Sequence, residues 1–168
     1  MTKFENLEIV RALWHDRPAT LKECTEQLVA FLIKLKEHNP DLFGIWYETG
    51  WSRKQALQNK LEFSYASIKR LFSKRIKNDE LYPETTYKAS AWSGGCDEEA
   101  VSFMARLGTG GHHLYPNSFD LELPFKGTWH EYYKNPAHQE ALINLVKDYW
   151  LPDRLMVKAW QGDFVYLL

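Results

Sequence analysis

The stretch from Thr85 to Leu123 reads TTYKASAWSGGCDEEAVSFMARLGTGGHHLYPNSFDLEL, and it decides what fold we expect. Three segments of it, Thr85–Trp92, Ala100–Leu107 and Phe119–Leu123, have the composition of β-strands. The last alternates strictly between apolar and acidic residues, which indicates one buried side and one side in water. The connections SGGCDEE and GTGGHHLYPN are rich in glycine and turn residues. This stretch therefore predicts three successive strands of an antiparallel sheet.

The flanking sequence adds strands and about four helices. The clearest helix begins at Thr20, which has capping-box spacing with Glu23, and it ends at Asn39-Pro40. The other helices are expected from Ser52 to Leu61, from Tyr65 to Lys77, and from Asn135-Pro136 to Leu151-Pro152. The other strands are expected at Leu7–Trp14, Leu42–Thr49, Leu155–Trp160 and Phe164–Leu167. We assign four tryptophans to the core, Trp14, Trp46, Trp150 and Trp160. The prediction is a single α+β layered domain over residues 1–168, mainly antiparallel sheet with about four helices packed against it.

Composition excludes several classes of protein. The chain has 168 residues, of which 45% are hydrophobic and 26% charged, so it is not a disordered, collagen-like or coiled-coil chain. The apolar runs are too short for a membrane span, and MTKFENLEIV lacks the apolar region of a secretory signal, so we expect a cytoplasmic protein. The two cysteines, Cys24 and Cys96, cannot form a disulfide framework, and no Cys/His spacing matches a zinc site. We expect neither metal nor cofactor.

Charge is segregated along the chain although the net charge is only −1. Residues 53–78 carry eight Lys and Arg against Glu62 alone, whereas residues 79–140 carry ten acids against four bases. Aromatic residues reach 15%, which is more than a core of this size needs, and Trp and Tyr are favoured at interfaces. These features are typical of a recognition surface.

Catalytic signals are weak. His112 and His113 lie in a glycine-rich loop, but spacing identifies no orienting partner or nucleophile for either. Ser93-Gly94-Gly95-Cys96 lacks the Gly-x-Ser-x-Gly elbow of hydrolases. A hydrolase using one of these histidines with Glu98 or Glu99 remains an alternative, but we expect that the protein is not an enzyme.

The helix expected at residues 65–77 contains KRLFSKRIK and could bind nucleic acid through its cations. Its Tyr65 and Phe72 lie on the apolar stripe and are needed for packing, which favours an ordinary solvated cationic face. The net charge of −1 also argues against a dedicated nucleic-acid binder. A binding module using helix 65–77 is therefore the alternative function.

Three acids, Asp97, Glu98 and Glu99, follow Trp92 at an expected turn. Acids in a turn are commonly just solvated. They also fit a patch for a basic partner, with Trp92 or Trp51 as an aromatic anchor. Carboxylates on a rigid turn can mimic phosphates and so block the cleft of a nuclease.

Three stretches resemble the immunity protein 52 family of bacterial polymorphic-toxin and type VI secretion systems. They are IWYETGWSRKQAL (Ile45–Leu57), AWSGG (Ala91–Gly95) and WLPDRLMVKAW (Trp150–Trp160), and the resemblance covers about Phe4 to Leu167. It implies a non-catalytic α+β protein that neutralises a toxin, encoded beside it, by direct binding. Partners of the family include toxins with a restriction-endonuclease-like nuclease domain.

The resemblance supplies no toxin-contacting residues, because the matching positions look like fold determinants: Gly44, Trp46, Gly50, Ser52, Trp92 and Gly94. We expect toxin binding, and no membrane or nucleic-acid partner. Our candidate contact residues are Asp97, Glu98, Glu99, Trp92, Trp51, His112 and His113.

Overall fold

The computed structural model describes residues 4–49, 52–73, 87–109, 116–159 and 162–168, and these residues form an α+β fold around one sheet. The strands are β1 Ile9–Trp14, β2 Tyr47–Glu48, β3 Tyr87–Trp92, β4 Ser102–Leu107, β5 Asn117–Glu122, β6 Arg154–Lys158 and β7 Phe164–Tyr166. Their order in the sheet is β2-β3-β4-β5-β1-β6-β7, and each neighbouring pair is antiparallel. The expected α+β class with an antiparallel sheet is therefore confirmed.

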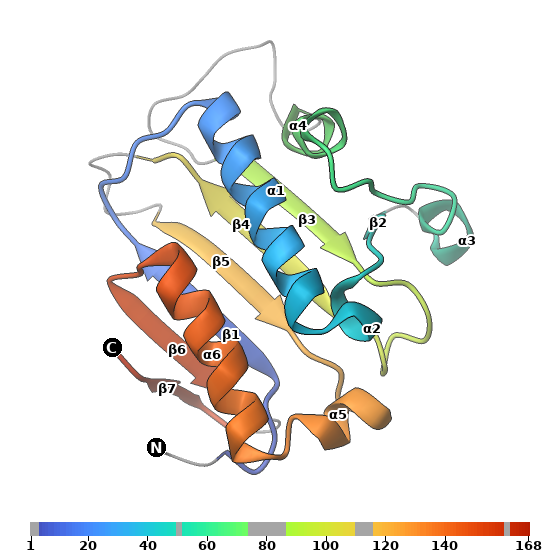
Figure 1. Ribbon diagram of the computed structural model, residues 1–168, viewed down its shortest axis with the longest axis vertical. Helices are drawn as coiled ribbons and strands as arrows, with labels where there is room; N and C mark the ends of the chain where they lie inside the picture. The colour runs from blue at the N-terminus through green and yellow to red at the C-terminus, as the bar shows by residue number, and fades with distance from the viewer. Residues whose placement is uncertain (1–3, 50–51, 74–86, 110–115, 160–161) are drawn as a thin grey trace.

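Six helices occur in the described residues instead of about four. They are α1 Leu21–His38, α2 Pro40–Phe43, α3 Arg53–Ala56, α4 Tyr65–Ser73, α5 Thr128–Tyr132 and α6 Pro136–Trp150. Figure 1 shows the two long helices, α1 and α6, side by side on one face of the sheet, with α3 and α4 beyond the β3 side and α5 at one end. The fold thus has a sheet layer and a helix layer.

Local chemistry explains both the success and the error around α1. The capping box is present, because the Thr20 hydroxyl accepts from the Glu23 N–H and the Glu23 carboxylate accepts from the Thr20 N–H. The expected strand Leu42–Thr49 is wrong over most of its length. The Asn39 side chain accepts from the Leu42 N–H and Pro40 occupies the first helical turn, so Asn39-Pro40 starts α2 as well as ending α1.

Two other differences concern short helices. The helix expected from Ser52 to Leu61 is only the four-residue α3, since the Leu61 N–H bonds to the Trp46 carbonyl instead of continuing the helix. Helix α5 was not expected, because its Gly127 cap provides no side-chain acceptor and leaves no capping signal in the sequence. The expected segment Lys74–Lys77 of the third helix lies outside the described residues.

Stacked aromatic side chains form the centre of the core between the sheet and the two long helices. Phe119 stacks on Trp150 at 5.4 Å and on Phe103 at 5.7 Å, and Trp14 stacks on Trp150 at 5.3 Å between ring centroids. Trp14, Trp46 and Trp150 are buried as expected, and Trp160 lies outside the described residues. Much of the aromatic surplus therefore serves packing and does not by itself mark an interface.

The two faces of the sheet differ. On β1, Val10, Ala12 and Trp14 are buried toward the helices, whereas Ile9, Arg11 and Leu13 alternate with them and are only partly buried. Strands β3 and β4 show the same alternation, whereas Ser118 on β5 and Met156 on β6 are buried although they face away from the helices. No helix of the described residues covers the opposite face in Figure 1. We call this opposite surface the helix-free face.

Candidate interaction surface

The three acids of the sequence lie in the loop between β3 and β4, which we call the acidic loop (residues 93–101). The β3–β4 register pairs Trp92 with Ser102 and so brings both ends of the loop together. Inside the loop, the Ser93 N–H donates to the Val101 carbonyl and the Val101 N–H donates to the Ser93 hydroxyl, both at 2.9 Å. These reciprocal bonds close the base of the loop.

A second set of contacts fixes the middle of the acidic loop. The Glu98 carbonyl accepts from the N–H groups of Phe125 and Lys126, both at 3.1 Å. The Glu98 carboxylate forms an ion pair with the Lys126 ammonium at 3.3 Å. The Glu99 carboxylate occupies the space where a side chain on residue 127 would begin, and residue 127 is glycine. The acids are therefore held on a braced turn, which reduces the conformational entropy that a binding event would remove.

Gly94 anchors the start of the acidic loop. Its φ is +76°, and a Cβ at this position would lie 2.8 Å from Cε2 of Tyr47 and 3.2 Å from Cδ2 of Leu57. Only glycine allows this backbone angle and this close approach without strain. The loop is thus seated against β2 on one side and against residues 125–127 on the other.

Sheet register places further residues beside the acidic loop. Tyr47 pairs with Trp92 across β2 and β3, and Ser102 pairs with Glu122 across β4 and β5. Alternation turns these side chains to the helix-free face, at the end of the sheet where the acidic loop emerges. We call the acidic loop with Tyr47, Trp92 and Glu122 the acidic end. Among the described residues, the ion pair formed by its four carboxylates joins Glu98 to Lys126, so acids outnumber the cations paired with them in this region.

The structure brings together four of the seven candidate contact residues. Asp97 and Glu99 are exposed, whereas Glu98 and Trp92 are partly buried, and all four belong to the acidic end. Trp51, His112 and His113 lie outside the described residues. The sequence alone did not indicate that Tyr47 and Glu122 belong to this surface. The alternation of Phe119–Leu123 did place Glu122 on a wet face, but only the register shows which residues are its neighbours.

The rest of the helix-free face divides into two rows across the strands. The middle row holds an ion pair, Arg11 to Asp120 at 2.9 Å, flanked by Met104 and Met156. The far row contains Lys88, Arg106, Ser118, Leu13 and Arg154. From β3 to β5 the face therefore changes along the strands from acidic to basic. On β1 and β6 the row beside Glu122 holds Ile9 and Lys158 instead, and Lys158 pairs with Glu8 at 3.2 Å.

The alternative binding region, the basic helix, is less available than its sequence indicates. The Arg70 guanidinium forms an ion pair at 3.3 Å with Glu48, whose side chain is only 4% exposed. The Lys69 ammonium lies 5.9 Å from the centre of the Tyr65 ring. Arg70 therefore stabilises a buried carboxylate, and α4 is described only as far as Ser73.

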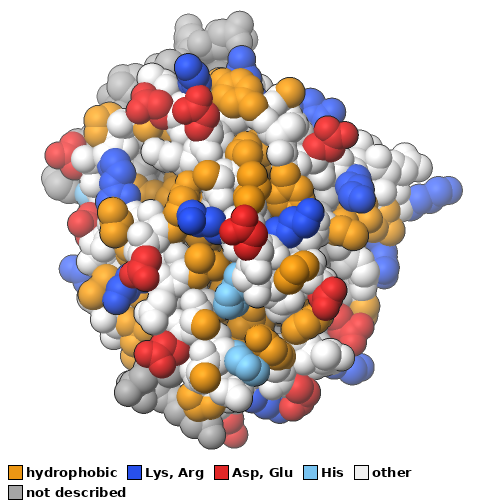
Figure 2. Space-filling view, viewed as in Figure 1, with side chains coloured by type: hydrophobic (Ala, Val, Ile, Leu, Met, Phe, Trp, Pro, Cys, Tyr) orange, Lys and Arg blue, Asp and Glu red, His pale blue; other side chains and the backbone are white. Residues whose placement is uncertain are grey.

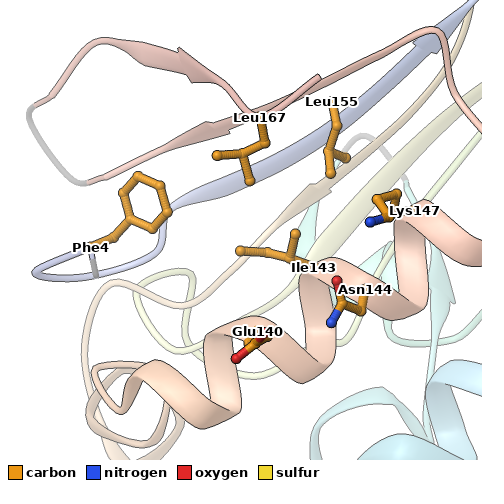
Figure 3. A pocket seen from close by; sticks show the side chains of 7 residues that line it. All are labelled: Phe4, Glu140, Ile143, Asn144, Lys147, Leu155 and Leu167. Carbon is orange, nitrogen blue, oxygen red and sulfur yellow. The ribbon is translucent and has the colours of Figure 1, made fainter. Parts of the chain in front are cut away.

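The helix-covered side offers no comparable charge pattern. Figure 2 shows acidic, basic and apolar side chains intermixed over it. A hollow of about 250 Å³ lies beside α6, and Figure 3 shows Phe4, Ile143, Leu155 and Leu167 around it, with Glu140, Asn144 and Lys147 on the helix. These seven residues include no histidine, hydroxyl or thiol, so the hollow lacks the usual nucleophile–base pair. It lies near β6, four strands away from β3 and the acidic loop.

In the ranges that the structure describes, no three His, Cys, Asp or Glu residues gather as a metal site requires. No helix among the same residues is long and apolar enough to cross a membrane. No protein-family model matches the chain, and no curated protein is significantly similar to it.

Proposed function

We propose that this chain is an immunity protein that binds a cognate bacterial toxin and neutralises it by direct contact. The acidic end is the surface that contacts the toxin. The observation that carries the proposal is the braced acidic loop with Trp92 and Tyr47 beside it. Hot spots of protein interfaces are enriched in Trp, Tyr and Arg, and charge at the rim steers association. The resemblance to the immunity protein 52 family supports the same function.

The charge of the acidic end suggests what kind of toxin it opposes. A nuclease binds a polyanion and so presents cations around its cleft. Carboxylates held on a fixed turn would compete with phosphates for those cations. A braced loop also loses little conformational entropy when it binds. A nuclease effector, for example one with a restriction-endonuclease-like domain, is therefore the toxin class that we propose.

The nucleic-acid alternative has weaker support. Arg70 of α4 is paired with Glu48, and the Lys69 ammonium lies 5.9 Å from the centre of the Tyr65 ring, so both cations already have a contact within the protein. We therefore place the function at the acidic end and not on α4.

Calorimetric titration against the toxin domain encoded beside this chain tests the proposal. We expect 1:1 binding with a nanomolar or lower Kd, and loss of the toxin's activity in the complex. Reversing Asp97, Glu98 and Glu99 to lysine should raise Kd by at least about tenfold, because attraction becomes repulsion.

The matched control reverses Glu26, Glu37 and Asp148, three exposed acids of α1 and α6, to lysine. It makes the same change in net charge away from the acidic end, so it should change Kd much less. Equal losses in both triple variants would mean that net charge, not the acidic end, governs binding. No heat at micromolar concentrations of the wild-type protein would refute the immunity function itself.

A further inference from the structure

The far row of the helix-free face carries an unexplained concentration of positive charge. Lys88 on β3 and Arg106 on β4 are directly opposite each other and both are exposed. Arg154 on β6 lies in the same row, three strand spacings or about 14 Å from Arg106. We call Lys88, Arg106 and Arg154 the basic row.

The basic row is not accounted for by contacts within the described residues. Like charges directly opposite each other on neighbouring strands destabilise a sheet. The other two cations of this face are neutralised, since Arg11 pairs with Asp120 at 2.9 Å and Lys158 with Glu8 at 3.2 Å. In contrast, no described acid pairs with the basic row, and the Arg154 guanidinium lies 5.6 Å from the centre of the Tyr166 ring.

A second observation points to a missing acceptor in the same row. Ser118 lies between Arg106 and Leu13 on the helix-free face and is 3% exposed. Its hydroxyl is buried without a hydrogen-bond partner. Such orphaned buried groups are rare in folded proteins and call for an explanation. An incoming carboxylate would pair with the exposed Lys88 and Arg106, and it would reach the Ser118 hydroxyl only after the atoms that cover this hydroxyl move.

The basic row and the acidic end are close enough for one partner to contact both. Lys88 and Trp92 are four residues apart on β3, which corresponds to about 13 Å. One side of a standard interface covers about 800 Å², a disc roughly 30 Å across. The surface between the two ends contains Met104, whose flexible side chain adapts to different partner shapes.

We infer that the basic row is a second contact region for the same toxin and binds an acidic segment of it. This inference rests on the proposed function and specifies the partner: a toxin surface that is basic opposite the acidic loop and acidic about 13 Å away. Opposite charges at the two ends admit one orientation, because the reversed orientation would bring like charges together. The helix-free face would thereby select its toxin as well as bind it.

The test compares Lys88→Glu/Arg106→Glu with the wild type in the same titration against the toxin domain. We expect Kd to rise at least about tenfold. The control, Lys34→Glu/Lys54→Glu, reverses two exposed cations of α1 and α3 and should leave Kd within about twofold. The single variant Lys88→Glu separates binding from folding, since it places Glu opposite Arg106. It should unfold at a higher urea concentration than the wild type and yet bind the toxin more weakly.

The outcomes distinguish this inference from the proposed function. Wild-type binding that persists unchanged in Lys88→Glu/Arg106→Glu overturns the basic row as a contact but leaves the immunity function in place. Absence of wild-type binding removes both. A fluorescein-labelled single-stranded 20-mer, DNA or RNA, is titrated in parallel. If the double variant loses affinity for the 20-mer and keeps its affinity for the toxin, the row binds nucleic acid and the inference is wrong.

Discussion

Two adjacent glycines in the acidic loop allow a sharp test of how the loop is held. Gly94 and Gly95 have φ angles of +76° and +83°, so an alanine at either position adopts a left-handed backbone that costs about 1–2 kcal/mol. The positions differ in their surroundings. A Cβ on Gly94 meets the Tyr47 ring at 2.8 Å and Leu57 at 3.2 Å, whereas a Cβ on Gly95 meets nothing within 4 Å.

We therefore expect Gly94→Ala to be clearly more destabilising than Gly95→Ala. The backbone cost is shared, and overpacking against the Tyr47 ring adds about 1–3 kcal/mol at residue 94 alone. Gly94→Ala should lower the free energy of unfolding by about 2–5 kcal/mol in total, and Gly95→Ala by about 1–2 kcal/mol. Urea denaturation followed by tryptophan fluorescence measures both values.

The same two substitutions in a Tyr47→Ala background identify the cause of the difference. Without the ring, the extra cost at residue 94 should shrink, and the double-mutant cycle should give a coupling energy on the order of 1 kcal/mol between residues 47 and 94. Equal destabilisation by both alanines, or a difference that is undiminished when the ring is removed, would refute the packing of the loop against Tyr47.

Three more predictions concern the core and the buried titratable groups. Gln139→Leu removes two hydrogen bonds to the Phe4 backbone and one to the Tyr133 carbonyl, at 2.7–3.3 Å. At about 1–3 kcal/mol per orphaned group, thermal unfolding should show a loss of stability of roughly 3 kcal/mol or more. A loss no larger than that of Glu140→Leu, at the exposed neighbouring position, would contradict this prediction. Burial, with a smaller effect of His138, lowers the pKa of His38 from 6.5, so the unfolded chain takes up this proton first as the pH falls. The contribution of His38 to the free energy of unfolding is therefore full above pH 6.5 and declines below it. The urea midpoint should fall less between pH 7.5 and pH 5.5 in His38→Gln than in the wild type. Burial raises the pKa of the Cys24 thiol to about 12, whereas Cys96 is exposed. Ellman's reagent should therefore titrate only Cys96 in the folded protein and both thiols in guanidinium. Rapid reaction of two thiols in the folded protein would contradict the burial of Cys24.

Elements with strong local signals were predictable from the sequence. The Thr20–Glu23 capping box and the Asn135-Pro136 start correspond to α1 and α6 because each signal is a bond between residues close in sequence. The alternation in Phe119–Leu123 likewise matches β5 within two residues. The errors have two causes. Tyr47–Glu48 is a two-residue strand whose pairing with β3 depends on contacts distant in sequence. Helix α2 did have a local signal, the Asn39-Pro40 cap, but the strand-forming residues that follow it led to the prediction of a strand.

The candidate site was predictable only in part, for the same reason. Asp97, Glu98 and Glu99 are adjacent in sequence, so their grouping was visible before the structure. Tyr47 and Glu122 join them through pairings with β3 and β4, and register is a tertiary property. The basic row is the clearest case, since Lys88, Arg106 and Arg154 come from three separate strands.

Charge is segregated in the structure as well as along the chain, but on the helix-free face of the sheet and not on the basic helix that the sequence indicated. The cationic run at residues 53–78 led us to α4, but Arg70 there serves the buried Glu48. The acidic run at residues 79–140 includes Lys88 and Arg106 among its four bases, and these two cations project from the helix-free face. The acids of this segment therefore lie at the loop end of β3 and β4, and Lys88 and Arg106 lie at the other end of the same strands. Under the proposed function, a face with this polarity would hold the toxin in a single orientation, which is a property by which an inhibitor distinguishes its own toxin from related ones.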